Sequence, residues 1–170
     1  IAFRSGRQMF DIGKTEATVD EMNDLVAAIV GDPTLYNNGT RAGFGYVGDI
    51  GSMPPNLDAL YSNPGSYATW NGPYVSNRIT QIPNDYKTDA WQVLYDYAGG
   101  VTITSTGSGD TLSRTIANST NDLLLNTVSG NVFDLDGTPP GADYADSVLV
   151  RVTYPNGAGS TVSEGTTTDP

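Results

Sequence analysis

The chain has 170 residues, of which 38% are hydrophobic and 16% are charged, so it can bury a core and is neither a coiled coil nor a charge-rich disordered chain. Its 19 acidic and 8 basic residues give a net charge of −11, which argues against nucleic-acid partners. The sequence contains no His and no Cys, which excludes disulfides, nucleophile–His pairs and His or Cys zinc sites, and leaves oxygen-ligand metals such as calcium. No apolar run approaches the roughly 20 residues that a membrane-spanning helix needs.

Residues 14–30 predict one amphipathic helix that ends at Gly31-Asp32-Pro33. The apolar residues that recur there at helical spacing are Val19, Met22, Val26 and Ile29, with Leu25 and Val30 beside them. Acidic and amide side chains occupy much of the rest of the helix. An apolar stripe on one side predicts a helix that lies on a sheet and is not surrounded by other elements.

The remaining elements are predicted to be short. Residues 31–56 are rich in Gly, Asn and Pro and indicate an irregular loop, while one or two helical turns are expected after Pro54, up to Tyr61. Aromatic and β-branched residues predict strands at 91–97, 100–105, 112–117, 124–128, 131–135 and 148–154. Residues 155–170 are rich in Gly, Ser and Thr, which is typical of a linker.

A helix followed by strands predicts an α+β fold, in which an N-terminal amphipathic helix packs on an antiparallel β-sheet and a β-rich C-terminal extension follows. Residues 122–170 contain seven acidic residues and a single basic residue, Arg151, so the charge balance shifts at the start of this segment. We therefore expect one domain over residues 1–122, with its sheet at about 91–117, and an extension with a flexible tail over residues 123–170.

Two short motifs suggest chemistry that their surroundings do not support. Residues 43–48 (GFGYVG) have the GxGxxG pattern of dinucleotide-binding turns, but no strand precedes them and a Pro-rich loop follows, so a tight Gly loop is expected. Residues 134–138 (DLDGT) resemble the DxDGT motif of haloacid-dehalogenase-type phosphatases. The 32 residues after Thr138 contain no Lys and no βα repeat, so a strand that ends in an Asp-Gly turn is expected instead. A calcium loop is an alternative, with the ligands Asp134, Asp136, Asp143 and Asp146.

Carboxylate pairs and aromatic residues leave two other classes of function open. Nineteen acidic residues offer many pairs of the kind used in glycoside hydrolysis, but nothing in the sequence singles out one pair. Ten Tyr and two Trp could form a face that stacks on sugars, although most such side chains belong to cores.

Five segments that follow the predicted helix resemble, in their order along the chain, the motifs of a known protein family. They are Pro54 with Leu57 and Leu60, 70–75 (WNGPYV), 82–85 (IPND), 89–97 (DAWQVLYDY) and 103–110 (ITSTGSGD). With these segments, residues 14–122 resemble the periplasmic part of a type IV pilin-like protein, closest to the major pseudopilin of type II secretion. Ala90 and Gln92 depart from the Pro and Gly that the family has in its D-P-W-G element.

The resemblance implies a structural protein and not an enzyme, namely a subunit of a bacterial pilus or type II secretion pseudopilus. Its partners would be copies of itself and other pilin-like subunits. Members of the family carry an apolar N-terminal helix, which we expect either upstream of Ile1 or on a separate chain, and membrane contact is expected through that helix alone. The resemblance implies a location in the bacterial cell envelope, in the periplasm or an extracellular filament, with membrane anchoring before assembly. The alternative function is a surface adhesion or carbohydrate-binding module, such as a minor pilin tip.

Calcium is the one cofactor that the resemblance leaves open. Major pseudopilins bind calcium in the loop that follows their S-x-G strand, and here that loop is 107–121, with Asp110 and Asp122 at its two ends. Together with the acidic turn at residues 134–138, this gives four candidate calcium ligands, Asp110, Asp122, Asp134 and Asp136. The basic residues that are candidates for ion pairs between subunits are Arg41, Arg78, Lys87 and Arg114.

Overall fold

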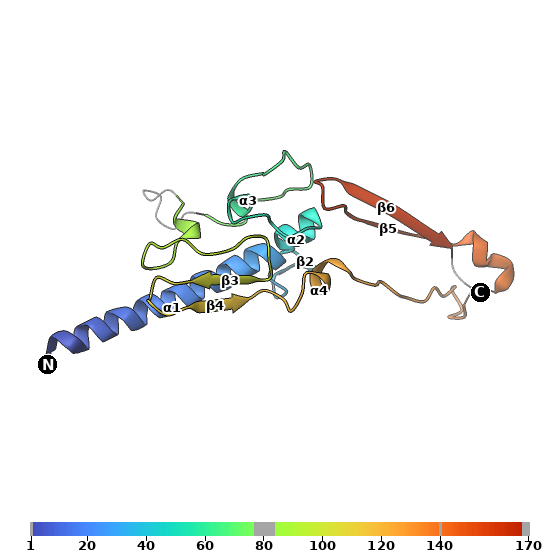
Figure 1. Cartoon of the computed structure of the whole chain (residues 1–170). Helices are drawn as coiled ribbons and strands as arrows, with labels where there is room; N and C mark the ends of the chain where they lie inside the picture. Colours follow the sequence, from blue (N-terminus) through green and yellow to red (C-terminus); the bar gives the residue numbers. More distant parts are fainter. Residues whose placement is uncertain (1, 77–83, 140, 168–170) are drawn as a thin grey trace.

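The computed structural model describes residues 2–76, 84–139 and 141–167 of the chain. It confirms an α+β chain with an N-terminal helix and small antiparallel sheets. The molecule is elongated, because helix α1 (Ala2–Val30) extends to one end and the hairpin of β5 (Leu149–Pro155) and β6 (Thr161–Thr167) extends toward the other (Figure 1). The strands of the described residues form three separate two-stranded sheets.

Helix α1 begins at Ala2, which is earlier than the predicted start near residue 14. Its C-terminal half packs on the body along one face, and the buried side chains of that face are Thr18, Met22, Leu25, Ala28 and Ile29. Val19, a predicted core residue, is instead 39% exposed. Thr18 takes a place on the buried face because its hydroxyl accepts a hydrogen bond from the N–H of Ala90 (3.2 Å), so its polar atom has a partner.

Two short helices cover α1. Helix α2 (Gly45–Ile50) lies in the segment predicted as an irregular loop, and it buries Tyr46, Val47 and Ile50. The prediction of a loop at the GxGxxG motif is therefore wrong. Gly45 has a φ of +64°, and a Cβ atom there would lie 2.3 Å from the backbone nitrogen of Gly31, so only Gly permits this close approach of α2 to the end of α1. Helix α3 (Asp58–Tyr61) confirms the helical turns expected after Pro54.

A ribbon of two antiparallel strands, β3 (Thr102–Ser105) and β4 (Leu112–Thr115), also lies on α1 (Figure 1). In this ribbon Ser105 is paired with Leu112. The predicted strand at 91–97 is wrong, since this segment makes only single bridges, Thr88 to Leu94 and Asp96 to Thr104. It follows the 3-10 helix η1 (Asp85–Lys87). A smaller hairpin, β1 (Tyr36–Asn37) and β2 (Thr40–Arg41), follows α1.

One apolar core joins these elements. It contains side chains from α1, α2 and α3, from the segment before β3 and from β3 itself, and the most deeply buried members are Ile29, Ile50, Leu60 and Ile103, each 0% exposed. Burial of a side chain of this size contributes about 1.5–3 kcal/mol. The segment of residues 91–97 contributes Tyr95 and Tyr97, which are buried, whereas Leu94 is 61% exposed.

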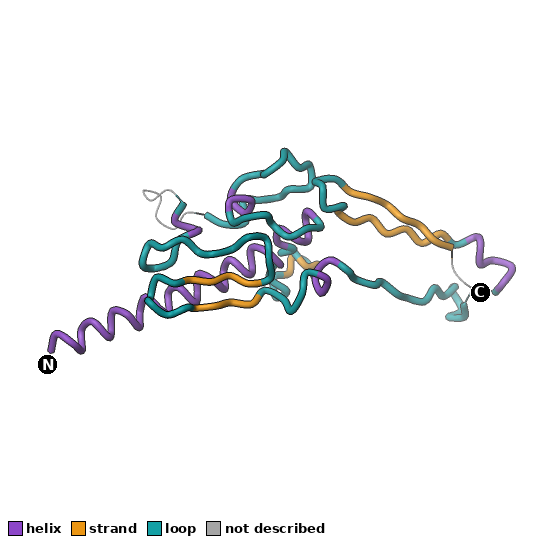
Figure 2. The backbone as a smooth tube through the Cα atoms, in the orientation of Figure 1, coloured by secondary structure: helices purple, strands orange, loops and turns teal. Residues whose placement is uncertain are grey.

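The C-terminal extension differs from its predicted form. The strands predicted at 124–128 and 131–135 are absent from these described segments, which instead contain helix α4 (Asn121–Leu124) and an extended chain (Figure 2). A 3-10 helix, η2 (Ala142–Ser147), precedes β5. The tail predicted as a linker forms β6, which pairs with β5 over seven residues. The turn is stabilised by Asn156, whose side-chain oxygen accepts hydrogen bonds from the N–H groups of Ala158 and Ser160.

The tip of the β5–β6 hairpin is fixed to the body by backbone hydrogen bonds. The N–H of Gly157 donates to the carbonyl of Ile50 (2.8 Å), and the carbonyl of Gly159 accepts from the N–H of Ala68 (2.9 Å). The ring of Tyr67 covers Gly159, where a Cβ atom would lie 2.4 Å from that ring. Away from the tip, every residue of both strands from Leu149 to Tyr154 and from Thr161 to Thr167 is exposed.

Candidate functional site

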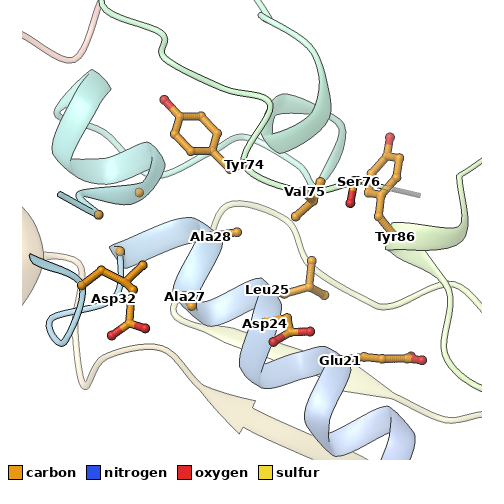
Figure 3. A pocket seen from close by; sticks show the side chains of 14 residues that line it. Glu21, Asp24, Leu25, Ala27, Ala28, Asp32, Tyr74, Val75, Ser76 and Tyr86 are labelled. Atoms are coloured by element: carbon orange, nitrogen blue, oxygen red, sulfur yellow. The ribbon is translucent and has the colours of Figure 1, made fainter. Parts of the chain in front are cut away.

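A groove of about 440 Å³ lies between α1 and the segment of residues 74–76 that faces it (Figure 3). Leu25 and Ala28 give it an apolar floor on the helix, and Val75 of the facing segment adds an apolar side chain to the opposite wall. Three acidic side chains also line it, namely Glu21 and Asp24 of α1 and Asp32, which follows the end of that helix. We call this feature the acidic groove.

Among the described residues that line the acidic groove, the charged side chains are all carboxylates. None of its described lining residues is Lys or Arg. Two hydrogen bonds from Thr34, through its hydroxyl (2.6 Å) and its N–H (2.8 Å), lower the pKa of Asp32, with a smaller effect from the nearby charge of Arg41. Glu21 accepts a hydrogen bond from the hydroxyl of Tyr95 (2.7 Å), which holds the carboxylate against the body. The groove therefore presents negative charge beside an apolar floor and is suited to a basic, partly apolar ligand.

The N-terminal part of α1 is the second exposed feature. The Lys14 ammonium lies 5.7 Å from the ring centre of Trp91, and before that point the helix projects from the body (Figure 1). Along this projection, Met9, Phe10 and Ile12 are 72%, 74% and 58% exposed. Residues 2–14, which we call the arm, contain three of the chain's eight basic residues and one acidic residue. The arm thus has the opposite charge to the groove.

Aromatic side chains of residues 70–74 pack on α2. The rings of Trp70 and Tyr74 meet edge to face with centres 5.6 Å apart, and Tyr74 meets Tyr46 of α2 in the same way at 5.9 Å. The indole N–H of Trp70 donates to the carbonyl of Ala59 (3.1 Å). These rings pack against each other and do not form an open platform for a sugar. The Tyr74 hydroxyl donates a hydrogen bond to Asp49 (2.8 Å), which lowers the pKa of that carboxyl. The effect of burial is larger, so the pKa of Asp49 is raised overall.

Asp89, in the segment that resembles the D-P-W-G element, joins three parts of the chain. It is 1% exposed, and its carboxylate accepts hydrogen bonds from the N–H groups of Trp91 and Val93 (both 2.9 Å), the Ser105 hydroxyl (2.7 Å) and the N–H of Gly107 (3.1 Å). A Cβ atom at position 107 would lie 2.2 Å from this carboxylate. With both oxygens occupied by the chain itself, Asp89 serves the architecture and does not bind a ligand.

The four candidate calcium ligands lie in three separate local structures. Asp110 lies between β3 and β4, and Asp122 lies in the first turn of α4, where its carboxylate accepts hydrogen bonds from the N–H and hydroxyl of Ser119. Asp134 and Asp136 share one turn, in which the N–H of Asp136 donates to the Asp134 carboxylate and the Thr138 hydroxyl donates to the Asp136 carboxylate. Side-chain hydrogen bonding with Asp134 and the bonds accepted from Thr138 lower the pKa of Asp136. The described residues contain no group of three or more acidic side chains placed to hold a metal ion.

Two of the four basic residues proposed for contacts between subunits are engaged within the chain. The Arg41 guanidinium donates to the carbonyls of Gly43 (3.1 Å) and Val30 (3.3 Å), next to the end of α1. The Lys87 ammonium lies 2.7 Å from a carboxylate oxygen of Asp58. Arg114 is exposed on β4, and Arg78 lies outside the described residues, as do Ile82 and Pro83 of the resembling segment.

Sequence reasoning missed the acidic groove. Its acidic residues were interpreted as the solvated side of an amphipathic helix, and the wall that makes this side concave comes from residues 74–76, far along the chain. The exposed arm was missed because the residues before position 14 show no clean helical stripe. No local signal in the sequence brings these segments together.

Comparisons with known proteins give no relative: no family model, curated protein or solved structure matches the chain. Along the stretches that the structure describes, none of the helices combines the length and the apolar character needed to cross a membrane.

Proposed function

We propose that the chain is a structural subunit of a bacterial filament of the type IV pilin-like class, closest to the major pseudopilin of type II secretion. The observation that carries this proposal is helix α1, which is 29 residues long and is covered by the body only along its C-terminal half. A helix of this length measures about 43 Å, so the arm extends well beyond its own globular part. Side chains such as Phe10, 74% exposed, need a partner to be removed from water.

The exposed arm supports assembly by contacts between identical chains. An arm that packs on a different surface of a second copy makes a heterologous contact. Heterologous contacts whose rotation does not close into a ring produce helical filaments, and this is the arrangement that we propose. The partners in this proposal are copies of the chain and other pilin-like subunits, and the location is the bacterial cell envelope.

Immunogold electron microscopy of the cells that produce the protein tests this function. An antibody raised against the purified chain is expected to label filaments or short fibres at the cell envelope, with repeated labels along one fibre. Label confined to the cytoplasm would overturn the proposal. Labelled spots at the surface without any fibre would favour the adhesion module, and binding of the chain to sugars, followed by Trp fluorescence, would then be measured.

Calcium binding stays a separate prediction. It is tested by the thermal unfolding midpoint of the purified chain with 2 mM calcium and with a chelator. If the loop with Asp110 and Asp122 holds calcium, the midpoint is expected to rise with calcium in the native chain and not in the Asp110→Asn and Asp122→Asn double variant.

A further inference from the structure

We propose that the acidic groove of one chain binds the arm of a second copy. The proposal rests on the proposed filament function and names the contact that joins neighbouring subunits. It commits to one occupant because the chain itself contains a segment with the chemistry that the groove calls for, namely exposed apolar side chains beside an excess of basic residues.

The arm cannot reach the groove of its own chain. Both lie on α1, which is one continuous helix, and Phe10 of the arm is 17 residues from Ala27 of the groove. At 1.5 Å per residue these two positions are about 25 Å apart along the helix axis. Any contact between the arm and an acidic groove is therefore a contact between two molecules.

Charge complementarity favours this contact. The arm contains three basic residues and one acidic residue, while the rest of the chain contains five basic and 18 acidic residues. Glu21, Asp24 and Asp32 line the groove without a described Lys or Arg among the lining residues, and Arg41, which lies near Asp32, is directed to backbone carbonyls. An approaching basic arm is thus attracted by the carboxylates of the groove, whereas two arms repel each other.

The apolar parts also fit. The groove has a volume of about 440 Å³ and apolar side chains at Leu25, Ala28 and Val75, which gives room for side chains such as Met9 and Phe10 of an entering arm. Each chain offers one arm and one groove at different places, so each bound arm leaves a free groove for the next copy. The contact is therefore heterologous and grows as a chain of subunits.

Disulfide trapping tests this contact directly, because the native chain has no Cys. We combine Phe10→Cys with Ala27→Cys, both at exposed positions, in the purified chain under mild oxidation. Since a disulfide needs Cα atoms less than about 7 Å apart, the two positions cannot pair within one molecule. We expect a ladder of dimers, trimers and longer species on non-reducing gels, whereas Phe10→Cys alone gives dimers at most. The matched control combines Phe10→Cys with Ser113→Cys, an exposed position on β4.

Two further measurements address the role of charge. Asp24→Lys in the Phe10→Cys, Ala27→Cys chain is expected to lower the yield of the ladder at least fivefold, while Asp110→Lys, at an exposed position away from the groove, leaves it unchanged. Raising the salt from 50 mM to 500 mM is expected to lower the yield as well, because exposed charges are screened. Circular dichroism of each variant verifies that the fold is retained.

The outcomes separate this inference from the filament function. A ladder no stronger than that of the Ser113→Cys control, or a ladder insensitive to both Asp24→Lys and salt, overturns the arm-in-groove contact. A groove that instead holds a small cation would give thermal stabilisation by calcium that Asp24→Asn removes, without any ladder, and this also overturns it. Labelled filaments without the ladder would leave the filament function standing, whereas a ladder without labelled filaments would leave the contact and remove the function.

Discussion

The chain contains two antiparallel ribbons that differ in what lies behind them. The β3–β4 ribbon lies on α1, and it buries Ile103 and Ser105, at 0% and 1% exposed. In the longer β5–β6 hairpin, Val150 and Val152 face a pocket that residues 128–132 also line, and each of the two side chains is 40% exposed. A two-stranded ribbon pairs only the backbone groups between its two strands and cannot bury side chains, so a core requires a second layer. In this molecule the number of paired residues in a ribbon therefore does not indicate how much that ribbon contributes to the free energy of unfolding.

The largest expected effect breaks the supported ribbon. Asp89→Ala removes the acceptor of four hydrogen bonds and leaves the Ser105 hydroxyl and three N–H groups without a partner. We expect the free energy of unfolding to fall by about 4 kcal/mol, measured by urea denaturation. Asp89→Asn is the matched control and is expected to cost about half as much, because one carbonyl oxygen is kept. A loss below about 1 kcal/mol in Asp89→Ala would show that Asp89 is not a structural centre.

The next comparison places equivalent truncations on the two ribbons. Ile103→Ala creates a cavity behind β3 and is expected to cost about 3 kcal/mol, whereas Val152→Ala on β5 removes a side chain that is already 40% exposed and is expected to cost less than about 0.5 kcal/mol. Both values come from urea denaturation at the same pH. Equal losses in the two variants would mean that β5–β6 is part of the main core.

A third variant detaches the hairpin without disturbing the core. Gly159 has a φ of +80° and lies against the Tyr67 ring, so Gly159→Ala is expected to strain the tip and weaken its attachment by about 1–2 kcal/mol. Amide hydrogen exchange should then speed up roughly tenfold in β5 and β6 and stay unchanged in α1. Gly130→Ala is the control, because Gly130 has open space around it. Faster exchange across α1 as well would show that hairpin and body unfold as one unit.

The smallest effect concerns the ion pair on the surface of the body. Hydrogen bonds from Lys87 and Tyr86 lower the pKa of Asp58 below its ordinary value of 3.8. This carboxylate therefore contributes stability above pH 3.8, and the contribution disappears as the pH falls through its lowered pKa. Because Asp58 is 52% exposed, Asp58→Asn is expected to cost no more than about 0.5–1 kcal/mol at pH 7 and close to nothing at pH 2.5, in urea denaturation at both pH values. A larger cost at pH 2.5 than at pH 7 would contradict the direction of the pKa shift.

Local sequence signals predicted the elements whose stability is local. The helical spacing at residues 19–29 predicted the second half of α1, and its face was misplaced by about one residue because Thr18, counted as polar, is buried through the Ala90 hydrogen bond. Helix α2 was missed because the glycines at 43, 45 and 48 indicate a loop. In the structure Gly45 has no side chain that would clash with Gly31, so α2 can pack closely on the end of α1.

Tertiary contacts decided the rest. The composition of residues 155–170 is typical of a linker, but pairing with β5 and the fixed turn at Asn156 make residues 161–167 a strand. In the other direction, residues 91–97 have strand-forming composition but bend around the Asp89 carboxylate. The acidic groove depends on contacts between α1 and residues 74–76, which no pattern along the sequence encodes.

The β1–β2 hairpin has a practical consequence for work in cells. Its base is fastened by Arg41 to the end of α1, while Gly39 at its turn has no atom within 4 Å of the place where a side chain would begin. An exposed turn on a fastened base tolerates extra residues. A short epitope or fluorogenic tag inserted between Asn38 and Gly39 should therefore report where the protein resides while leaving both ends of the polypeptide untouched.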